Sequence, residues 1–222
     1  AGKADLMHRL AIPAAFILLA TPVLPEPICS LDPNTPTCAP APLRDAQGIL
    51  LPGLHILFEQ PTDRYDHAVL GDALEWGALT YLHQGSAEHG PFLMTTVALP
   101  NTRVFEDLAP RVAELADNSS PEIIVVETDI ALGASLAIYV LGEENLVKLA
   151  ATPFIGQPHR WLAPAGIADF DGDGRVEIAY VDRPHLLADL VFVRLEGARL
   201  VETLRLPGLS NHRIGDDLIS GG

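Results

Sequence analysis

A nine-residue segment, Asp169–Glu177, carries the strongest chemical signal in the chain. It reads DFDGDGRVE, with carboxylates at positions 1, 3, 5 and 9 and glycine at positions 4 and 6. Ca²⁺ takes roughly six to eight oxygen ligands, and a tight loop of alternating acidic side chains supplies them. Glycine at position 6 permits the sharp backbone turn that points these groups at one centre. We therefore expect a Ca²⁺ site with ligands from Asp169, Asp171, Asp173, the main-chain carbonyl of Arg175, and Glu177.

Three other interpretations of this segment remain open. An EF-hand loop is closed by Glu at its twelfth position, but Tyr180 stands there, and the flanking sequence is typical of strands. Mg²⁺ suits the segment less well, because it demands near-ideal octahedral geometry and keeps its waters. A solvated acidic hairpin without any metal is the third possibility. Four carboxylates in one short loop would repel one another, so we expect a bound cation to be part of the fold.

The acidic segment also takes part in an internal repeat. Residues 110–127 align with the region of the loop at a constant spacing of 55 residues, so that Glu114 falls on Asp169 and Glu122 on Glu177. Each copy predicts a short apolar strand, an acidic loop, and a stronger strand that begins with Glu. Repeats of roughly 40–55 residues with four strands each are typical of β-propeller blades.

Short runs rich in β-branched and aromatic residues recur along the chain between clusters of Gly, Pro, Asp and Asn. None shows a sustained helical stripe, so we predict strands and an all-β fold. Eight of the predicted strands are 55–60, 79–84, 92–99, 122–128, 135–141, 176–182, 189–196 and 199–206.

Together, the repeat and the strands predict a partial β-propeller over residues 54–222. We place four-stranded blades at about 62–100, 104–155 and 161–208, with another blade beginning at 209. A ring that lacks a blade exposes sheet faces and edges, so we expect the natural protein to continue past Gly222. The number of blades in the full protein stays open.

The first 53 residues read as an export segment followed by a linker. A charged start precedes a short apolar run, Leu10–Ala20, which predicts a signal peptide region at 1–24 rather than a membrane span. A buried N-terminal helix is the alternative, and the cleavage site is open. Residues 25–53 are rich in Pro and predict an irregular linker. We therefore expect a periplasmic or secreted protein with no membrane span after signal removal.

Only two cysteines occur in the chain, Cys29 and Cys38. In an exported protein they could close a small disulfide loop within the linker. One of them could instead pair with a cysteine outside this sequence. Their spacing matches no zinc motif.

The composition disfavours two classes of partner. The 222 residues are 48% hydrophobic, enough for a sizeable core, and carry 14 Lys and Arg against 29 Asp and Glu. The formal net charge of −15 repels nucleic acid phosphates and anionic lipid headgroups. We expect neither nucleic acid nor an anionic membrane as a partner.

The segment IADFDGDGRVEIAYVD, residues 167–182, resembles the repeat of the FG-GAP/VCBS β-propellers, whose fold is shared with the integrin α-subunit head. The resemblance covers most of residues 62–222 and rests on this one specific motif. It implies metal ligands at the five positions named above. The second repeat departs from the pattern, with Ala116 at the third loop position and Asn118 at the fifth. Whether the loop Glu114–Glu122 binds an ion is open.

Four other side chains in the predicted strands and blades allow two interpretations each. His67 and His212 open similar segments, and we interpret them as structural contacts rather than as metal ligands or acid–base groups. Trp76 and Trp161 stand near blade starts, and we interpret them as fillers between blades rather than as sugar-stacking platforms.

The resemblance implies a function outside the cytoplasm, since family members are mostly secreted or cell-surface binding and scaffolding modules. We expect a non-enzymatic, Ca²⁺-stabilised module that binds a protein or glycan of unknown identity. The alternatives are a polysaccharide-active hydrolase or lyase with its site on the channel face, and a purely structural domain. The sequence holds no recognisable nucleophile, acid–base pair or cofactor motif. His159, Arg160 and His185 flank the metal segment, but their spacing does not place them together.

Overall fold

The computed structural model describes residues 28–29, 38–39, 47–51, 53–71, 73–84, 92–116, 121–143 and 145–220. The chain divides into two compact units, Ala1–Leu43 and Arg44–Gly222. In the first unit, β1 (Ile28–Cys29) pairs antiparallel with β2 (Cys38–Ala39), and the backbone of Cys29 lies opposite that of Cys38. The predicted signal region at 1–24 and the cysteine side chains lie outside the described residues, so the disulfide stays a prediction.

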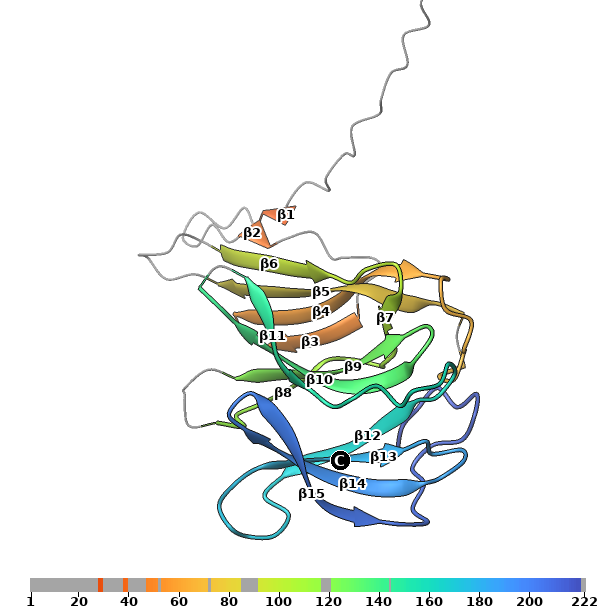
Figure 1. The fold of residues 1–222 in the computed structure, drawn as a ribbon. Helices are drawn as coiled ribbons and strands as arrows, with labels where there is room; N and C mark the ends of the chain where they lie inside the picture. Colours follow the sequence, from red (N-terminus) through yellow and green to blue (C-terminus); the bar gives the residue numbers. More distant parts are fainter. Residues whose placement is uncertain are drawn as a thin grey trace, which may run out of the picture. The chain divides into compact units, whose positions relative to one another are not determined.

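The second unit consists of three successive antiparallel meanders, which Figure 1 shows one after another along the colour ramp. The first meander contains β3 (Gln47–Leu51), β4 (Leu54–Thr62), β5 (Glu75–Gln84) and β6 (Phe92–Ala98). The second contains β8 (Arg111–Ala113), β9 (Glu122–Asp129), β10 (Gly133–Leu141) and β11 (Leu146–Ala151). The third contains β12 (Leu162–Ala168), β13 (Glu177–Asp182), β14 (Asp189–Glu196) and β15 (Arg199–Leu206).

A short strand, β7 (Arg103–Phe105), joins the first two meanders. It pairs with β5 through Trp76 and Phe105, and with β9 over its whole length. The first two meanders therefore form one nine-stranded sheet, whereas the third is a separate four-stranded sheet.

The all-β class is confirmed, since no helix occurs among the described residues and all eight predicted strands are present. The described strands close neither a barrel nor a propeller ring. None of the described residues forms a helix long and apolar enough to cross a membrane.

The boundaries of the predicted blades differ from the structure in two places. The first predicted blade, 62–100, omits β3, which lies in the segment assigned to the Pro-rich linker, and most of β4, which was predicted as a strand at 55–60 but left outside the blade although it pairs with β5. The blade predicted to begin at 209 has no strand over residues 209–220, which form turns and irregular structure.

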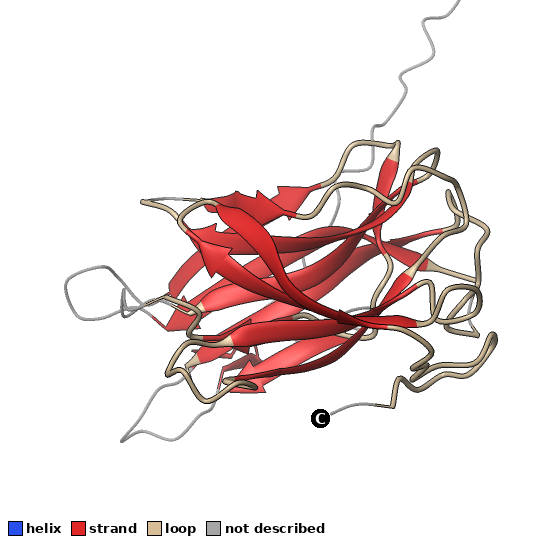
Figure 2. Ribbon diagram, turned by 60° about the horizontal axis from the view of Figure 1, so that its bottom comes forward, coloured by secondary structure: helices blue, strands red, loops and turns tan. Residues whose placement is uncertain are grey.

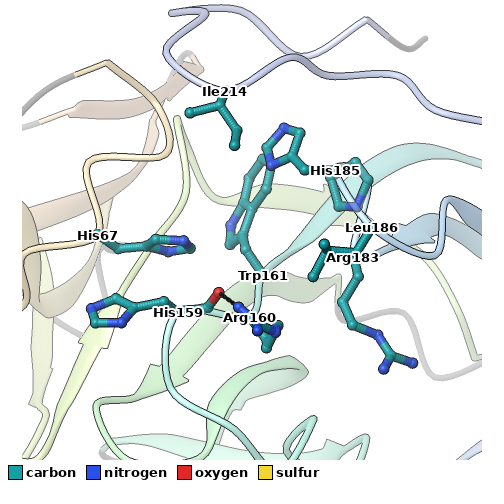
Figure 3. Close-up of a pocket in the computed structure, with 9 residues that line it drawn as sticks. His67, His159, Arg160, Trp161, Arg183, His185, Leu186 and Ile214 are labelled. Carbon is teal, nitrogen blue, oxygen red and sulfur yellow. Dashed lines mark hydrogen bonds between the residues drawn. The ribbon is translucent and has the colours of Figure 1, made fainter.

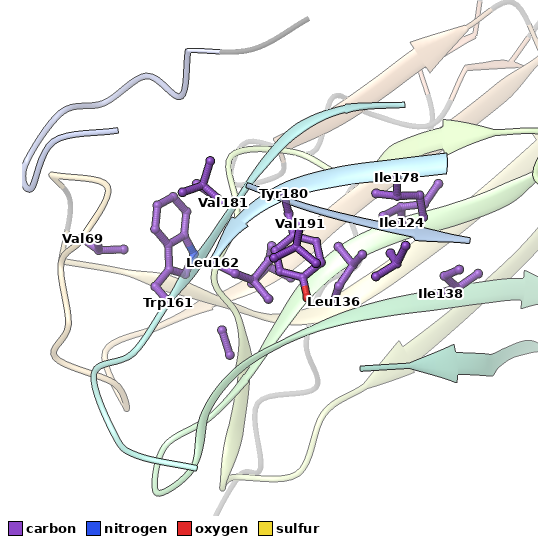
Figure 4. Close-up of a cluster of buried hydrophobic side chains, with 14 of the residues drawn as sticks. Val69, Ile124, Leu136, Ile138, Trp161, Leu162, Ile178, Tyr180, Val181 and Val191 are labelled. Carbon is purple, nitrogen blue, oxygen red and sulfur yellow. The ribbon is translucent and has the colours of Figure 1, made fainter. Parts of the chain in front are cut away.

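The hydrophobic core lies on both faces of the second meander. Ile123 and Val125 of β9 pack in a cluster with β4 and β5, whereas Ile124 and Val126 pack in a second cluster with β12, β13 and β14. Figure 4 shows this second cluster. Alternate side chains of a strand point to opposite faces, so a strand covered on both faces reads as the unbroken apolar run IIVV. Burying each of these side chains stabilises the fold by about 1.5–3 kcal/mol.

The loops gather at the ends of the strands, as Figure 2 shows. Strand β13 runs from Glu177 to Asp182, so the acidic segment before it and the turn after it lie at opposite ends of the third sheet. Two separate candidate sites follow from this arrangement, one at each end.

Candidate functional site

The predicted calcium segment forms the connection between β12 and β13. The flanking strands pair up to Ala168 and Glu177, so the segment between them closes a hairpin. Gly172 and Gly174 adopt left-handed φ values of 77° and 85°. Residues with a side chain rarely adopt this conformation, which accounts for glycine at both positions.

Backbone amides hold the acidic side chains of this loop in place. Oδ1 of Asp169 accepts the N–H groups of Gly172 (2.7 Å) and Asp173 (3.1 Å), and its Oδ2 accepts that of Gly174 (2.9 Å). Asp173 also donates its N–H to Oδ1 of Asp171 at 3.1 Å, and the N–H of Arg175 donates to Oδ1 of Asp173 at 2.9 Å. The loop therefore bends around its own carboxylates.

Three of the predicted ligands come together. Asp169, Asp171 and Glu177 each present a carboxylate oxygen within 4.8 Å of the others. Both aspartates are exposed, whereas Glu177 is only 2% exposed. Asp173 lies outside this group of three and instead pairs through Oδ2 with Arg194 at 3.1 Å.

Arg194 is a member of the cluster that the sequence analysis missed. It lies on β14 directly opposite Glu177, and its Nε donates to Oε1 of Glu177 at 2.7 Å. Its Nη2 also donates to Oδ2 of Asp171 at 3.2 Å. The hydrogen bond to Glu177 raises the pKa of the guanidinium above its ordinary value. The only sign of this role in the sequence was that Arg194 is a charged residue inside the apolar run LVFVRL.

The chemistry of this donor set fits a hard cation. Carboxylate oxygens are the ligands that Ca²⁺ prefers, and the loop amides already orient them. The guanidinium of Arg194 neutralises part of the same negative charge, so Arg194 and a bound ion would compete for Asp171 and Glu177. Calcium binding at this loop therefore requires Arg194 to withdraw, at least partly, from these carboxylates.

The second meander contains a matching contact 55 residues earlier. The N–H of Leu115 donates to Oε2 of Glu122 at 2.7 Å, and the N–H of Phe170 donates to Oε2 of Glu177 at 3.0 Å. In both places a buried Glu at the start of a strand accepts the backbone N–H of the residue seven positions before it. Asn118, which was aligned with the fifth loop position, lies outside the described residues.

A second site lies at the other end of the strands, where the structure brings together residues that sequence spacing did not. We call it the histidine pocket, a cavity of about 240 Å³ shown in Figure 3. Four connections contribute to it: those after β4, β11 and β13, and the segment after β15. Its lining residues are His67, His159, Arg160, Trp161, Arg183, Pro184, His185, Leu186 and Ile214.

A buried carboxylate orients His67 in this pocket. Nδ1 of His67 lies 2.5 Å from Oε1 of Glu106, whose side chain is fully buried. The other oxygen, Oε2, accepts the hydroxyl of Thr128 at 2.6 Å. Burial raises the pKa of Glu106, and the hydrogen bond from His67 opposes that rise.

A pair of histidines lies beside Trp161. Nε2 of His212 donates to the carbonyl of Asp216 at 2.9 Å, because a carbonyl oxygen can only accept. Nδ1 of a neutral His212 then accepts from Nε2 of His185, 3.0 Å away. The His212 ring packs edge-on against Trp161, whose Nε1 donates to the carbonyl of Glu106 at 2.9 Å.

His159 extends the pocket toward the first meander. Its ring stacks on Tyr65, and its Nε2 lies 3.1 Å from Oδ1 of Asp66. Trp76, the other tryptophan, lies elsewhere, stacked near Phe58. The pocket residues come from four separate connections, so no spacing rule could have grouped them.

No family model, curated protein or solved structure matches this chain.

Proposed function

We propose that this chain is a Ca²⁺-binding β-propeller module of the FG-GAP/VCBS type, which acts outside the cytoplasm by binding a protein or glycan without enzymatic turnover. The observation that carries the calcium assignment is the convergence of Asp169, Asp171 and Glu177, whose carboxylate oxygens lie within 4.8 Å of one another.

The strand arrangement supports the propeller part of the proposal. Four-stranded antiparallel meanders that follow one another in the chain, with hydrophobic clusters between them, are typical of propeller blades. The equivalent amide contacts of Glu122 and Glu177 support two copies of one structural unit. A propeller also accounts for a middle meander that is buried on both faces.

The proposed role of the ion is to tie the β12–β13 loop to the sheet. Glu177 is buried at the start of β13, whereas Asp169 and Asp171 are exposed in the loop. An ion held by all three would therefore link a surface loop to the central strand. Such an ion binds the folded state alone, because the three side chains meet only there, and so stabilises it.

The experiment that tests this proposal is thermal unfolding in the presence of Ca²⁺ and of EDTA. At a Ca²⁺ concentration about 100-fold above Kd, we expect the folded state to gain about 2.7 kcal/mol. Asp171→Asn should lose most of the calcium-dependent rise in Tm, whereas Asp217→Asn, an exposed change outside the loop, should retain it. An unchanged Tm for the wild type, or equal shifts in both variants, would refute the calcium assignment.

A further inference from the structure

The histidine pocket has an unusual charge for this chain. Asp and Glu outnumber Lys and Arg by 29 to 14 in the sequence, yet no carboxylate is among the nine lining residues. Two arginines and three histidines line it instead. The guanidinium of Arg183 pairs with Asp182 at 2.8 Å, and its side chain extends away from Trp161 in Figure 3. Arg160 is therefore the cationic group available to a ligand.

The guanidinium of Arg160 forms few interactions with the described residues. It lies next to Trp161, and its Nη1 donates to the carbonyl of His159 at 2.9 Å, the dashed line in Figure 3. It forms no ion pair with any described residue. A guanidinium offers several donors in a planar fork, which matches a carboxylate on a ligand.

Two histidines add hydrogen-bond acceptors. When Glu106 is ionised and His67 is neutral, Glu106 accepts the Nδ1–H of His67, and Nε2 of His67 keeps a lone pair. His185 uses Nε2–H to bond His212, which leaves its Nδ1 with a lone pair. Each of these lone pairs is able to accept a hydrogen bond from a hydroxyl group of a ligand. Leu186 and Ile214 supply apolar surface beside them.

This arrangement lowers the stability of the folded protein. Glu106 is fully buried, and His212 is 6% exposed, although burying ionisable groups is costly. His159 and Arg183 adopt left-handed φ values of 54° and 48°, each at a cost of about 1–3 kcal/mol. Strained backbone and buried ionisable groups tend to gather at functional sites.

We propose that the histidine pocket binds a single sugar unit that carries a carboxylate, that is, a uronic acid. Arg160 binds the carboxylate, His67 and His185 accept sugar hydroxyls, and the apolar side chains contact the C–H surface of the ring. The cavity of about 240 Å³ lies just below the range of about 300–1,000 Å³ for drug-sized ligands, which suits one sugar unit. This inference names a glycan class for the binding role proposed above, but it does not require the calcium loop.

The test is a titration of the intact protein with sodium D-galacturonate, followed by calorimetry and by tryptophan fluorescence. The buffer contains EDTA, so that a failure of the calcium proposal cannot change the outcome. We expect saturable binding of galacturonate, and binding of D-galactose at least about tenfold weaker. Arg160→Gln should weaken galacturonate binding at least about tenfold, whereas Arg199→Gln, an exposed change at the β14–β15 hairpin, should alter it less than about twofold.

His67→Gln provides a second test, because it removes the oriented acceptor and keeps the arginine. It should weaken galacturonate binding as well, with far-ultraviolet circular dichroism confirming the fold. Inorganic phosphate serves as a competitor, and it should displace galacturonate poorly. The proposal is overturned by an absence of saturable binding up to about 10 mM, by equal affinity for galactose, by phosphate competing as well as the sugar acid, or by Arg160→Gln binding like Arg199→Gln.

Discussion

Arg194 and Glu177 face each other across β14 and β13, and Nε of Arg194 donates to Oε1 of Glu177 at 2.7 Å. Glu177 is almost fully buried, so its negative charge requires a partner. The protein thus carries its own cation at the place where the sequence predicts Ca²⁺. A metal bound there changes an existing ion pair rather than filling an isolated cluster of negative charge.

The variant Arg194→Met tests this competition. Without Ca²⁺, the variant should unfold at lower urea than the wild type, because its buried carboxylate loses its cation. With the guanidinium gone, Ca²⁺ should bind at least about tenfold more tightly. Urea denaturation in EDTA and a calcium titration measure the two effects. Arg199→Met, on the same sheet and exposed, is the matched control; unchanged or weaker calcium binding in Arg194→Met would show that the guanidinium does not compete.

The packing between the second and third meanders predicts a large effect at Ile124. Its side chain is fully buried in the cluster of Figure 4. Ile124→Ala should lower the free energy of unfolding by about 2–5 kcal/mol, because it leaves a cavity between two sheets. Leu204→Ala, at a position 48% exposed on β15, should cost less than about 1 kcal/mol. Urea denaturation compares them, and a loss at Ile124 no greater than that at Leu204 would contradict this packing.

His185 makes stability depend on pH. Burial lowers its pKa below the ordinary value of 6.5, and repulsion between the protonated forms of His185 and His212 acts in the same direction; His67 and Asp216 also act on it electrostatically. The unfolded chain therefore binds more protons at this residue than the folded chain does. The stabilisation is present above about pH 6.5 and is lost as the pH falls through the lower, folded-state pKa.

The corresponding experiment is urea denaturation of the wild type and His185→Gln between about pH 8 and pH 5. The variant should lose less stability than the wild type over this interval. His83→Gln, exposed on β5, should behave like the wild type. Parallel pH profiles for the wild type and His185→Gln would mean that His185 is not the group responsible.

Most of the strands were predictable because their burial in the core requires the apolar, β-branched residues that mark them in the sequence. The run IIVV of β9 reflects burial on two faces, and it was found from residue types alone. Strands β3 and β7 were missed: β3 lies in the segment assigned to the Pro-rich linker, and β7 has only three residues, whose place depends on pairing with β5 and β9. Local sequence carries little information about such pairing.

The convergence of Asp169, Asp171 and Glu177 was also predictable, because these residues lie within nine positions of one another in the chain. Arg194 was not, since it reaches Glu177 through the register of β13 and β14. The histidine pocket depends still more on tertiary structure. His67 and Glu106 are 39 residues apart in the chain, and only the fold places one against the other.

Isothermal titration calorimetry of the intact protein with Ca²⁺ tests the central claim most directly. We predict that the wild type binds one Ca²⁺ at the β12–β13 loop. The affinity for Ca²⁺ should be at least about tenfold weaker in Asp171→Asn and unchanged in Asp217→Asn. A wild-type protein that binds no Ca²⁺, or an Asp171→Asn variant that binds it with wild-type affinity, would contradict the assignment of this loop as a calcium site.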